Sequence, residues 1–193
     1  MNVPMPVLSP VSAERRSRDG AQTDARGLPR ADRGRVKISV SAERRIDAPA
    51  ARVYGYLADF RDHHPRFLPR QFGDFEVETG GYGAGTVHRF TLTLGGRCVP
   101  YRVRVGEPDP GRVLIESDPE KRMLTTFTVE PESTSTCLVR IETRWYTDGV
   151  TAFVERAMAP RMLRRVYREE LMLLDRYVRE TVPPSPARPR VLA

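Results

Sequence analysis

The chain has 193 residues, of which 39% are hydrophobic and 30% charged, a composition typical of one globular domain. No apolar run approaches the ~20 residues that a membrane span needs. Pro4, Pro6 and Pro10 interrupt the place where a signal peptide would be continuously apolar. We therefore expect a cytoplasmic protein without a membrane span.

The positive charge is concentrated at the two ends of the chain. Residues 1–35 contribute +3 and residues 182–193 contribute +2 to the formal net charge of +7. Both ends are rich in proline and arginine and have no hydrophobic period. We therefore predict a disordered tail over residues 1–35, one domain over 36–182 and a second disordered tail over 183–193. Because the domain itself is nearly neutral, nucleic acid is not an expected partner.

The cysteines and histidines form no metal-binding pattern. Cys98 and Cys137 make neither a disulfide framework nor a zinc motif, so free thiols are expected. His63 and His64 are adjacent and His88 stands alone, so no pair has the spacing of metal ligands. We expect no metal and no cofactor.

The glycine-rich segment Gly80–Thr86 superficially matches a phosphate-binding loop. Such a loop needs a following helix that directs backbone N–H groups at the anion. Residues 87–94 instead alternate between apolar and polar side chains, as in a strand. We expect a strand connection here and no bound nucleotide.

The first periodic segment is Lys37–Ile46, in which apolar and polar residues alternate as in a half-buried strand. Arg44 occupies an inner position of this strand. A short helix with an apolar face is expected within residues 46–60, followed by a second short helix or turn over residues 61–68.

From Phe72 to Trp145 the hydrophobic period is two, which predicts six further strands, with a turn at Gly95 and Gly96. Clean alternation indicates an antiparallel sheet with one face in solvent. The inner face is expected to carry Phe75, Val77, His88, Phe90, Leu92, Leu94, Val99, Tyr101, Val103, Val105, Cys137, Val139, Ile141, Thr143 and Trp145.

The longest periodic segment is the last one, from about Val150 to Thr181. At 100° per residue its large apolar residues share one face, while the arginines and Asp175 point away from it. A helix of this kind is the natural cover for the inner face of the sheet. Its apolar face consists of Leu163, Tyr167, Leu171, Leu174 and Val178.

Four segments resemble the SRPBCC (START/Bet v 1-like) superfamily, in its polyketide cyclase/dehydrase-like branch: IDAPAARVYGYLADF, GGYGAGT, TFTVEP and APRMLRRVYREEL. The resemblance covers about residues 37–180. It implies an α+β helix-grip fold, with two short helices after the first strand and a curved seven-stranded antiparallel sheet around a long C-terminal helix. It also implies a deep apolar cavity between the sheet and that helix.

Members of this superfamily bind lipids, sterols, polyketides, quinones or plant hormones. The resemblance therefore implies a monomer or homodimer that binds a small hydrophobic or aromatic molecule, such as a lipid or polyketide. Two alternatives stay open. One is an aromatase/cyclase-like enzyme for polyketide ring closure and dehydration; the other is an interaction protein like the coenzyme-Q-binding or ribosome-associated members.

Polar residues on apolar faces are the candidate functional groups. A cyclase needs a base for the α-proton and a donor for the enolate oxygen, and His88 or Glu170 is the candidate base and Arg44 or Tyr101 the candidate donor. Because a buried charge needs a partner, a structural Arg44–Glu170 pair is also expected, and Glu170→Gln would then cost a few kcal/mol. The expected ligand-binding residues are Phe75, His88, Phe90, Leu92, Tyr101, Val103, Phe127, Ile141, Trp145, Leu163, Tyr167 and Glu170.

Overall fold

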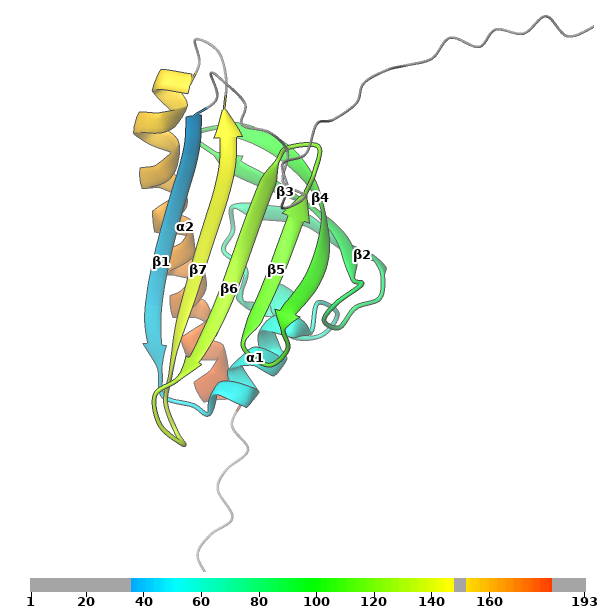
Figure 1. The fold of residues 1–193 in the computed structure, drawn as a ribbon, viewed down its shortest axis with the longest axis vertical. Helices are drawn as coiled ribbons and strands as arrows, with labels where there is room; N and C mark the ends of the chain where they lie inside the picture. Colours follow the sequence, from blue (N-terminus) through cyan, green and yellow to red (C-terminus); the bar gives the residue numbers. More distant parts are fainter. Residues whose placement is uncertain (1–35, 148–151, 182–193) are drawn as a thin grey trace, which may run out of the picture. The chain divides into compact units, whose positions relative to one another are not determined.

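The computed structural model describes residues 36–147 and 152–181 (Figure 1). The two predicted tails, and Val150 at the expected start of the last helix, lie outside the described residues. The elements in chain order are β1 (Val36–Ile46), α1 (Ala50–Ala58), the 3-10 helix η1 (His64–Phe67), β2 (Phe72–Thr79), β3 (Val87–Leu94), β4 (Arg97–Asp109), β5 (Val113–Asp118), β6 (Met123–Pro131), β7 (Cys137–Thr147) and α2 (Ala152–Glu180).

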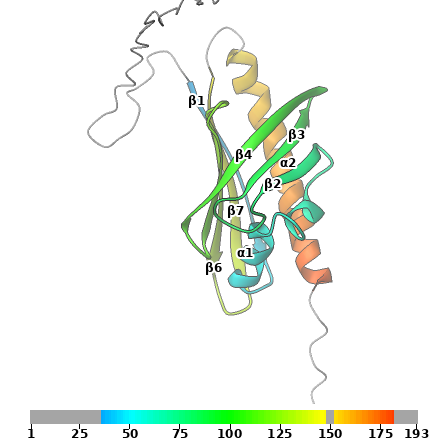
Figure 2. The ribbon, with the colours of Figure 1, turned by 90° about the vertical axis from the view of Figure 1, so that its right-hand side faces the viewer.

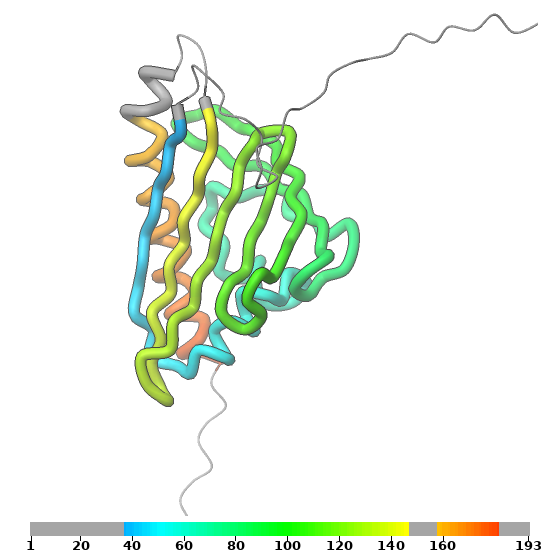
Figure 3. Tube along the Cα trace, viewed as in Figure 1, coloured from blue at the N-terminus to red at the C-terminus, as the bar shows by residue number. Residues whose placement is uncertain are grey.

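The strands form one seven-stranded sheet in the order β1-β7-β6-β5-β4-β3-β2, and all neighbours pair antiparallel. The sheet is curved: β1 and β7 run beside α2, and β2 to β4 bend round towards the same helix (Figure 1, Figure 2). The Cα trace in Figure 3 shows the same course. This architecture confirms the predicted helix-grip fold, including the two short helices after the first strand.

The long helix α2 packs its predicted apolar face against the sheet. Every residue of that face is at most 7% exposed: Leu163, Tyr167, Leu171, Leu174 and Val178. Burial of a large apolar side chain contributes roughly 1.5–3 kcal/mol, so this face alone is enough to hold the helix in place.

The β3–β4 hairpin brings the sheet close to α2 at one end. Leu94 pairs with Arg97, and the two residues between them, Gly95 and Gly96, have φ values of 58° and 81°, which glycine adopts without steric cost. A Cβ on Gly95 would lie 3.1 Å from the Cε atom of Met162. The hairpin tip is therefore in near contact with the helix.

Arg44 is paired with Asp175 and not with Glu170, which corrects the expected pair. The Arg44 Nε and Nη2 atoms donate to the Asp175 carboxylate at 2.9 and 2.6 Å. Asp175 is 3% exposed and also forms an ion pair with Arg179, whose Nη1 atom lies 3.0 Å from Asp175 Oδ1. Asp175 was expected to face solvent, but the carboxylate is buried between α2 and β1 because two guanidinium groups compensate its charge.

Replacing Asp175 by asparagine should lower the free energy of unfolding by about 1–2 kcal/mol, because charge-assisted hydrogen bonds are lost while Arg44 keeps access to water. Urea denaturation at pH 7 measures the change. Glu180→Gln on the same helix is the matched control, since the Arg176–Glu180 pair is 68% and 60% exposed and should contribute under ~0.5 kcal/mol. Equal losses in the two variants would contradict this role of Asp175.

Candidate ligand-binding site

A cavity of about 470 Å³ lies between the concave face of the sheet and α2. Its wall is mainly aromatic and aliphatic, with few polar groups. The lining residues are His64, Leu68, Phe72, Phe75, His88, Phe90, Leu92, Leu94, Gly95, Arg97, Val99, Tyr101, Glu116, Lys121, Met123, Thr125, Phe127, Thr143, Trp145, Met158, Ala159, Met162, Leu163, Tyr167 and Glu170.

Most of the residues expected to bind ligand line this cavity. Val103 and Ile141 do not: each is 1% exposed and packs in the hydrophobic core. Arg44, the candidate donor, is also absent from the wall because its side chain reaches Asp175. The structure places the following predicted residues in the wall: Phe75, His88, Phe90, Leu92, Tyr101, Phe127, Trp145, Leu163, Tyr167 and Glu170.

Aromatic rings form flat walls of the cavity. Phe90 stacks on Tyr101, with ring centroids 5.3 Å apart and an interplanar angle of 17°. Phe72 is tilted against Phe90 at 5.4 Å. The neighbouring position of Phe90 and Tyr101 follows from the β3–β4 register, in which the two residues are directly paired. Flat apolar walls of this kind favour planar ligands.

His88 and Glu116 form a buried pair at the base of the cavity. The His88 Nε2 atom lies 3.2 Å from Glu116 Oε1, and the two residues are 1% and 6% exposed. Burial acts to raise the pKa of Glu116, but the hydrogen bond to His88 and the electrostatic attraction of His88 and His64 together outweigh it and hold this pKa below its ordinary value. The ionised carboxylate therefore accepts a hydrogen bond from Nε2–H.

This bond leaves the other nitrogen of His88 without a partner. Among the described residues, no group hydrogen-bonds to the buried Nδ1 atom. In the neutral ring with Nε2–H, Nδ1 carries a lone pair. Phe60, Phe75 and Phe90 surround the imidazole, so Nδ1 is enclosed by apolar rings.

His64 presents an imidazole lone pair to the cavity. Its Nδ1 atom lies 2.7 Å from the carbonyl oxygen of Leu57, and because a carbonyl only accepts, Nδ1 carries the proton. Burial lowers the pKa of His64, against the attraction of Glu116, so the ring is neutral. Nε2 is then an acceptor, and the side chain lines the cavity.

Glu170 projects from α2 into the same cavity as a protonated acid. It is 3% exposed, and within the described part of the chain no hydrogen bond or ion pair compensates its carboxyl group. Burial raises the pKa of Glu170 well above its ordinary value, and the negative charge of Glu116 adds to the rise. A neutral carboxylic acid donates a hydrogen bond, which suits the carbonyl oxygen of a ligand.

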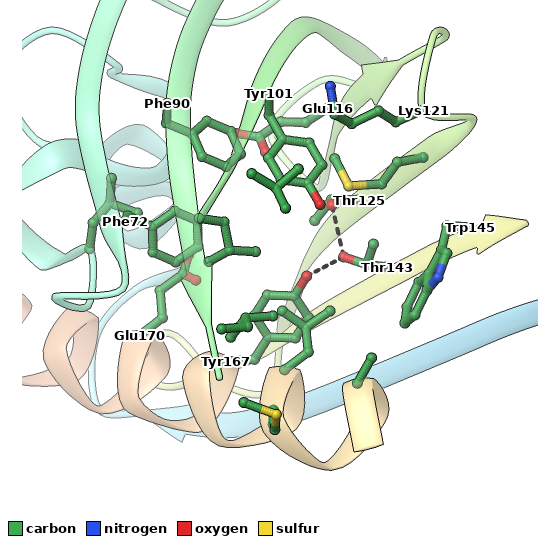
Figure 4. Close-up of a pocket in the computed structure, with 18 of the residues that line it drawn as sticks. Phe72, Phe90, Tyr101, Glu116, Lys121, Thr125, Thr143, Trp145, Tyr167 and Glu170 are labelled. Carbon is green, nitrogen blue, oxygen red and sulfur yellow. Dashed lines mark hydrogen bonds between the residues drawn. The ribbon is translucent and has the colours of Figure 1, made fainter. Parts of the chain in front are cut away.

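Three hydroxyl groups, those of Thr125, Thr143 and Tyr167, also line the cavity and are hydrogen-bonded to one another (Figure 4). Thr125 Oγ1 lies 2.7 Å from Thr143 Oγ1, and Thr143 also hydrogen-bonds to the Tyr167 hydroxyl. Burial raises the pKa of Tyr167, so its phenol keeps the proton. The chain of hydroxyls links β6, β7 and α2.

Sequence reasoning missed three of these polar residues. Glu116 and Thr125 are each two residues from a buried apolar residue, Leu114 and Phe127, and so lie on the same inward face of their strands; the period of two therefore predicted their direction. His64 lies in η1, where no period indicates which way a side chain points. Its position was not readable from the sequence.

Within residues 36–147 and 152–181, no helix has both the length and the hydrophobicity of a membrane span. The same residues contain no group of three or more His, Cys, Asp or Glu side chains arranged to hold a metal ion.

Comparison with solved structures finds the same fold in proteins of several kinds. The KanY protein is 29% identical with a TM-score of 0.66, over 75% of this chain and 99% of that one. The Zhui aromatase/cyclase from Streptomyces sp. R1128 is 16% identical with a TM-score of 0.61, over 76% and 97%. Norcoclaurine synthase from Thalictrum flavum, in complex with dopamine and hydroxybenzaldehyde, is 16% identical with a TM-score of 0.60, over 78% and 91%.

No curated protein sequence matches the chain. The pattern of the family described as "Polyketide cyclase / dehydrase and lipid transport" matches residues 37–179, which include every strand from β2 to β7, both short helices and nearly all of α2. The match confirms the SRPBCC-type resemblance. By its sequence, its sheet topology and the cavity between sheet and helix, this chain belongs to the polyketide cyclase/dehydrase and lipid transport family.

Proposed function

We propose that this protein binds a small aromatic molecule with keto or hydroxyl groups in the cavity between the sheet and α2. The observation that carries the proposal is the carboxyl group of Glu170, which lines the cavity, is buried and has no protein partner among the described residues. A buried polar group without a partner costs free energy. A ligand oxygen at this position would remove that cost.

The size and lining of the cavity agree with a ligand of this class. Pockets for small molecules have volumes of roughly 300–1,000 Å³ and few polar groups among apolar ones, and this cavity of about 470 Å³ fits that range. Glu170 supplies a donor, whereas the neutral ring of His64 supplies an acceptor at Nε2. A planar molecule with both carbonyl and hydroxyl groups satisfies both.

Fluorescence of Trp145 tests the proposal. Trp145 is the chain's only tryptophan and lines the cavity, so its emission reports occupancy. We expect 1-naphthol, hydroxynaphthoquinones and flavonoids to quench it saturably and to raise the melting temperature, since they bind only the native state. Hexadecane, which has no polar atoms, should bind more weakly. If none of these compounds changes the emission, the proposed function is wrong.

A second candidate function is acid–base catalysis on the bound molecule, favoured by imidazole side chains and a carboxylic acid that line one cavity. In an aldol ring closure, an imidazole nitrogen removes a proton from the carbon between two carbonyl groups. The electron pair forms the new carbon–carbon bond, and the attacked carbonyl oxygen takes a proton from Glu170. The hydroxyl then leaves together with a proton from the adjacent ring carbon as one water molecule, and enolisation of the remaining ring ketone gives the aromatic ring.

Turnover of a linear poly-β-ketone mimic separates the two functions. If the protein is an enzyme, Glu170→Gln and His88→Ala each lower kcat by about 100-fold or more, because the acid or the base is lost while the cavity keeps its shape. If it is a binding protein, wild type closes no ring faster than buffer does.

A further inference from the structure

The cavity has acidic and basic residues on different sides. Glu170 is buried on one side of the cavity, whereas Lys121 lies on the other side (Figure 4), and a second cationic residue, Arg97, also lines the wall. Figure 4 shows Lys121 and Trp145 on one side of the cavity and Glu170 and Phe72 on the other.

The cationic side of the cavity is its mouth. Of the residues in the wall, those classed as exposed are Gly95, Arg97 and Met158. They come from the β3–β4 hairpin, the start of β4 and the first half of α2. Met158 is 58% exposed, so an apolar side chain stands beside the opening together with Arg97.

Arg97 points towards the cavity from the first residue of β4. It shares the parity of Val99 and Tyr101, which also line the cavity, so the inner row of this strand ends in a guanidinium group. No carboxylate within the described residues forms an ion pair with Arg97. In the part of the chain that the structure describes, the charge of Arg97 therefore has no counter-ion.

Lys121 is held at the mouth by two contacts. Asp118, 2% exposed, lies 3.6 Å from the Lys121 Nζ atom and accepts a hydrogen bond from its backbone N–H at 3.0 Å. The ammonium group also lies 5.1 Å from the ring centroid of Tyr101, a cation–π distance. An ammonium has three donor hydrogens, so capacity for an anion remains.

We propose that the natural ligand carries a carboxylate or phosphate group at one end, which Arg97 and Lys121 bind at the mouth while the aromatic part fills the cavity. The inference rests on the proposed function and adds the orientation and charge of the ligand. An anion at the mouth pairs with Arg97, which has no ion-pair partner among the described residues, and the neutral keto or hydroxyl end of the ligand then faces the buried carboxyl group of Glu170.

Matched ligands test this anion site. Calorimetric titration compares 2-naphthoate and 2-naphthyl phosphate with the neutral 2-naphthamide, against wild type, Arg97→Gln and Lys121→Gln. Arg104→Gln is the control, because Arg104 is exposed on the opposite face of β4 and does not line the cavity. It removes the same charge from the same strand.

We expect the anions to bind wild type about tenfold more tightly than the amide, and each variant at the mouth to lose about three- to fivefold of that preference, as for one exposed charge pair. The preference should shrink in 0.5 M NaCl, and Arg104→Gln should leave it unchanged. Whichever of the two anions binds more tightly identifies the headgroup.

Two results overturn the inference in different ways. If anions and amide bind equally and Arg97→Gln has no effect, the mouth is not an anion site, but the proposed function survives. If none of the three binds wild type, the proposed function fails and the anion site fails with it.

Discussion

Replacing Glu170 by glutamine raises the free energy of unfolding at pH 7 and leaves it unchanged at pH 4. In the unfolded chain glutamate ionises near its ordinary pKa, whereas burial and the charge of Glu116 keep Glu170 protonated in the fold to much higher pH. The pKa of Glu170 is higher in the folded state than in the unfolded state. The free energy of unfolding of wild type is therefore at its full value below the unfolded-state pKa, and it falls as pH rises from there towards the folded-state pKa. The loss is about 1.4 kcal/mol for each pH unit within that window.

Glutamine removes this slope because it has no proton to lose. Urea denaturation of wild type and Glu170→Gln between pH 4 and pH 8 measures the difference. Glu169→Gln, the adjacent residue on α2, is the control and should change stability by less than ~0.5 kcal/mol at every pH. A variant less stable than wild type at pH 7 would show that Glu170 is ionised and paired.

Replacing Glu116 by alanine lowers the free energy of unfolding by about 3 kcal/mol at pH 7, because removal of one member of a buried pair leaves the other unsatisfied. The pKa of Glu116 is lowered in the fold, so its stabilising effect is present above the ordinary glutamate pKa and disappears as pH falls through the folded pKa. The deficit of Glu116→Ala should therefore shrink in acid.

The control for Glu116 is Glu76→Ala, on the edge strand β2 of the same sheet. Glu76 pairs with Arg89, and the two side chains are 57% and 56% exposed, so the loss should stay below ~1 kcal/mol. A double-mutant cycle with His88→Ala gives the coupling energy of the buried pair. If the losses in free energy of unfolding from Glu116→Ala and His88→Ala are additive, the two side chains do not interact, which would contradict the buried pair.

The fold was largely predictable because the hydrophobic period of two recurs along most of the strands and a helical period follows it. Alternation over β2 to β7 fixes which side chains face inward, and the apolar face of α2 shows that one helix covers them. The same parity placed His88, Tyr101 and Trp145 in the cavity wall.

The pairing of charges was not predictable from these periods. Glu170 and Asp175 are five residues apart on α2, which rotates one about 140° from the other around the helix axis. Which of them meets Arg44 depends on how the helix lies across β1, and the sequence does not specify that position. In the structure Arg44 pairs with Asp175, and Glu170 lines the cavity. Glu170→Gln is therefore expected to raise the free energy of unfolding at pH 7, whereas the sequence alone led us to expect a loss.

The most direct test of the central claim is calorimetric titration of 1-naphthol into wild type and a variant whose cavity is filled. Ala159→Trp introduces an indole at a residue of the wall, and Met172→Trp, at a position that is 50% exposed on the same helix and not part of the wall, is the matched control. We predict binding to wild type and to Met172→Trp with equal affinity, and a loss of at least tenfold in Ala159→Trp. Equal affinity in all three proteins would contradict the claim that ligands bind in this cavity.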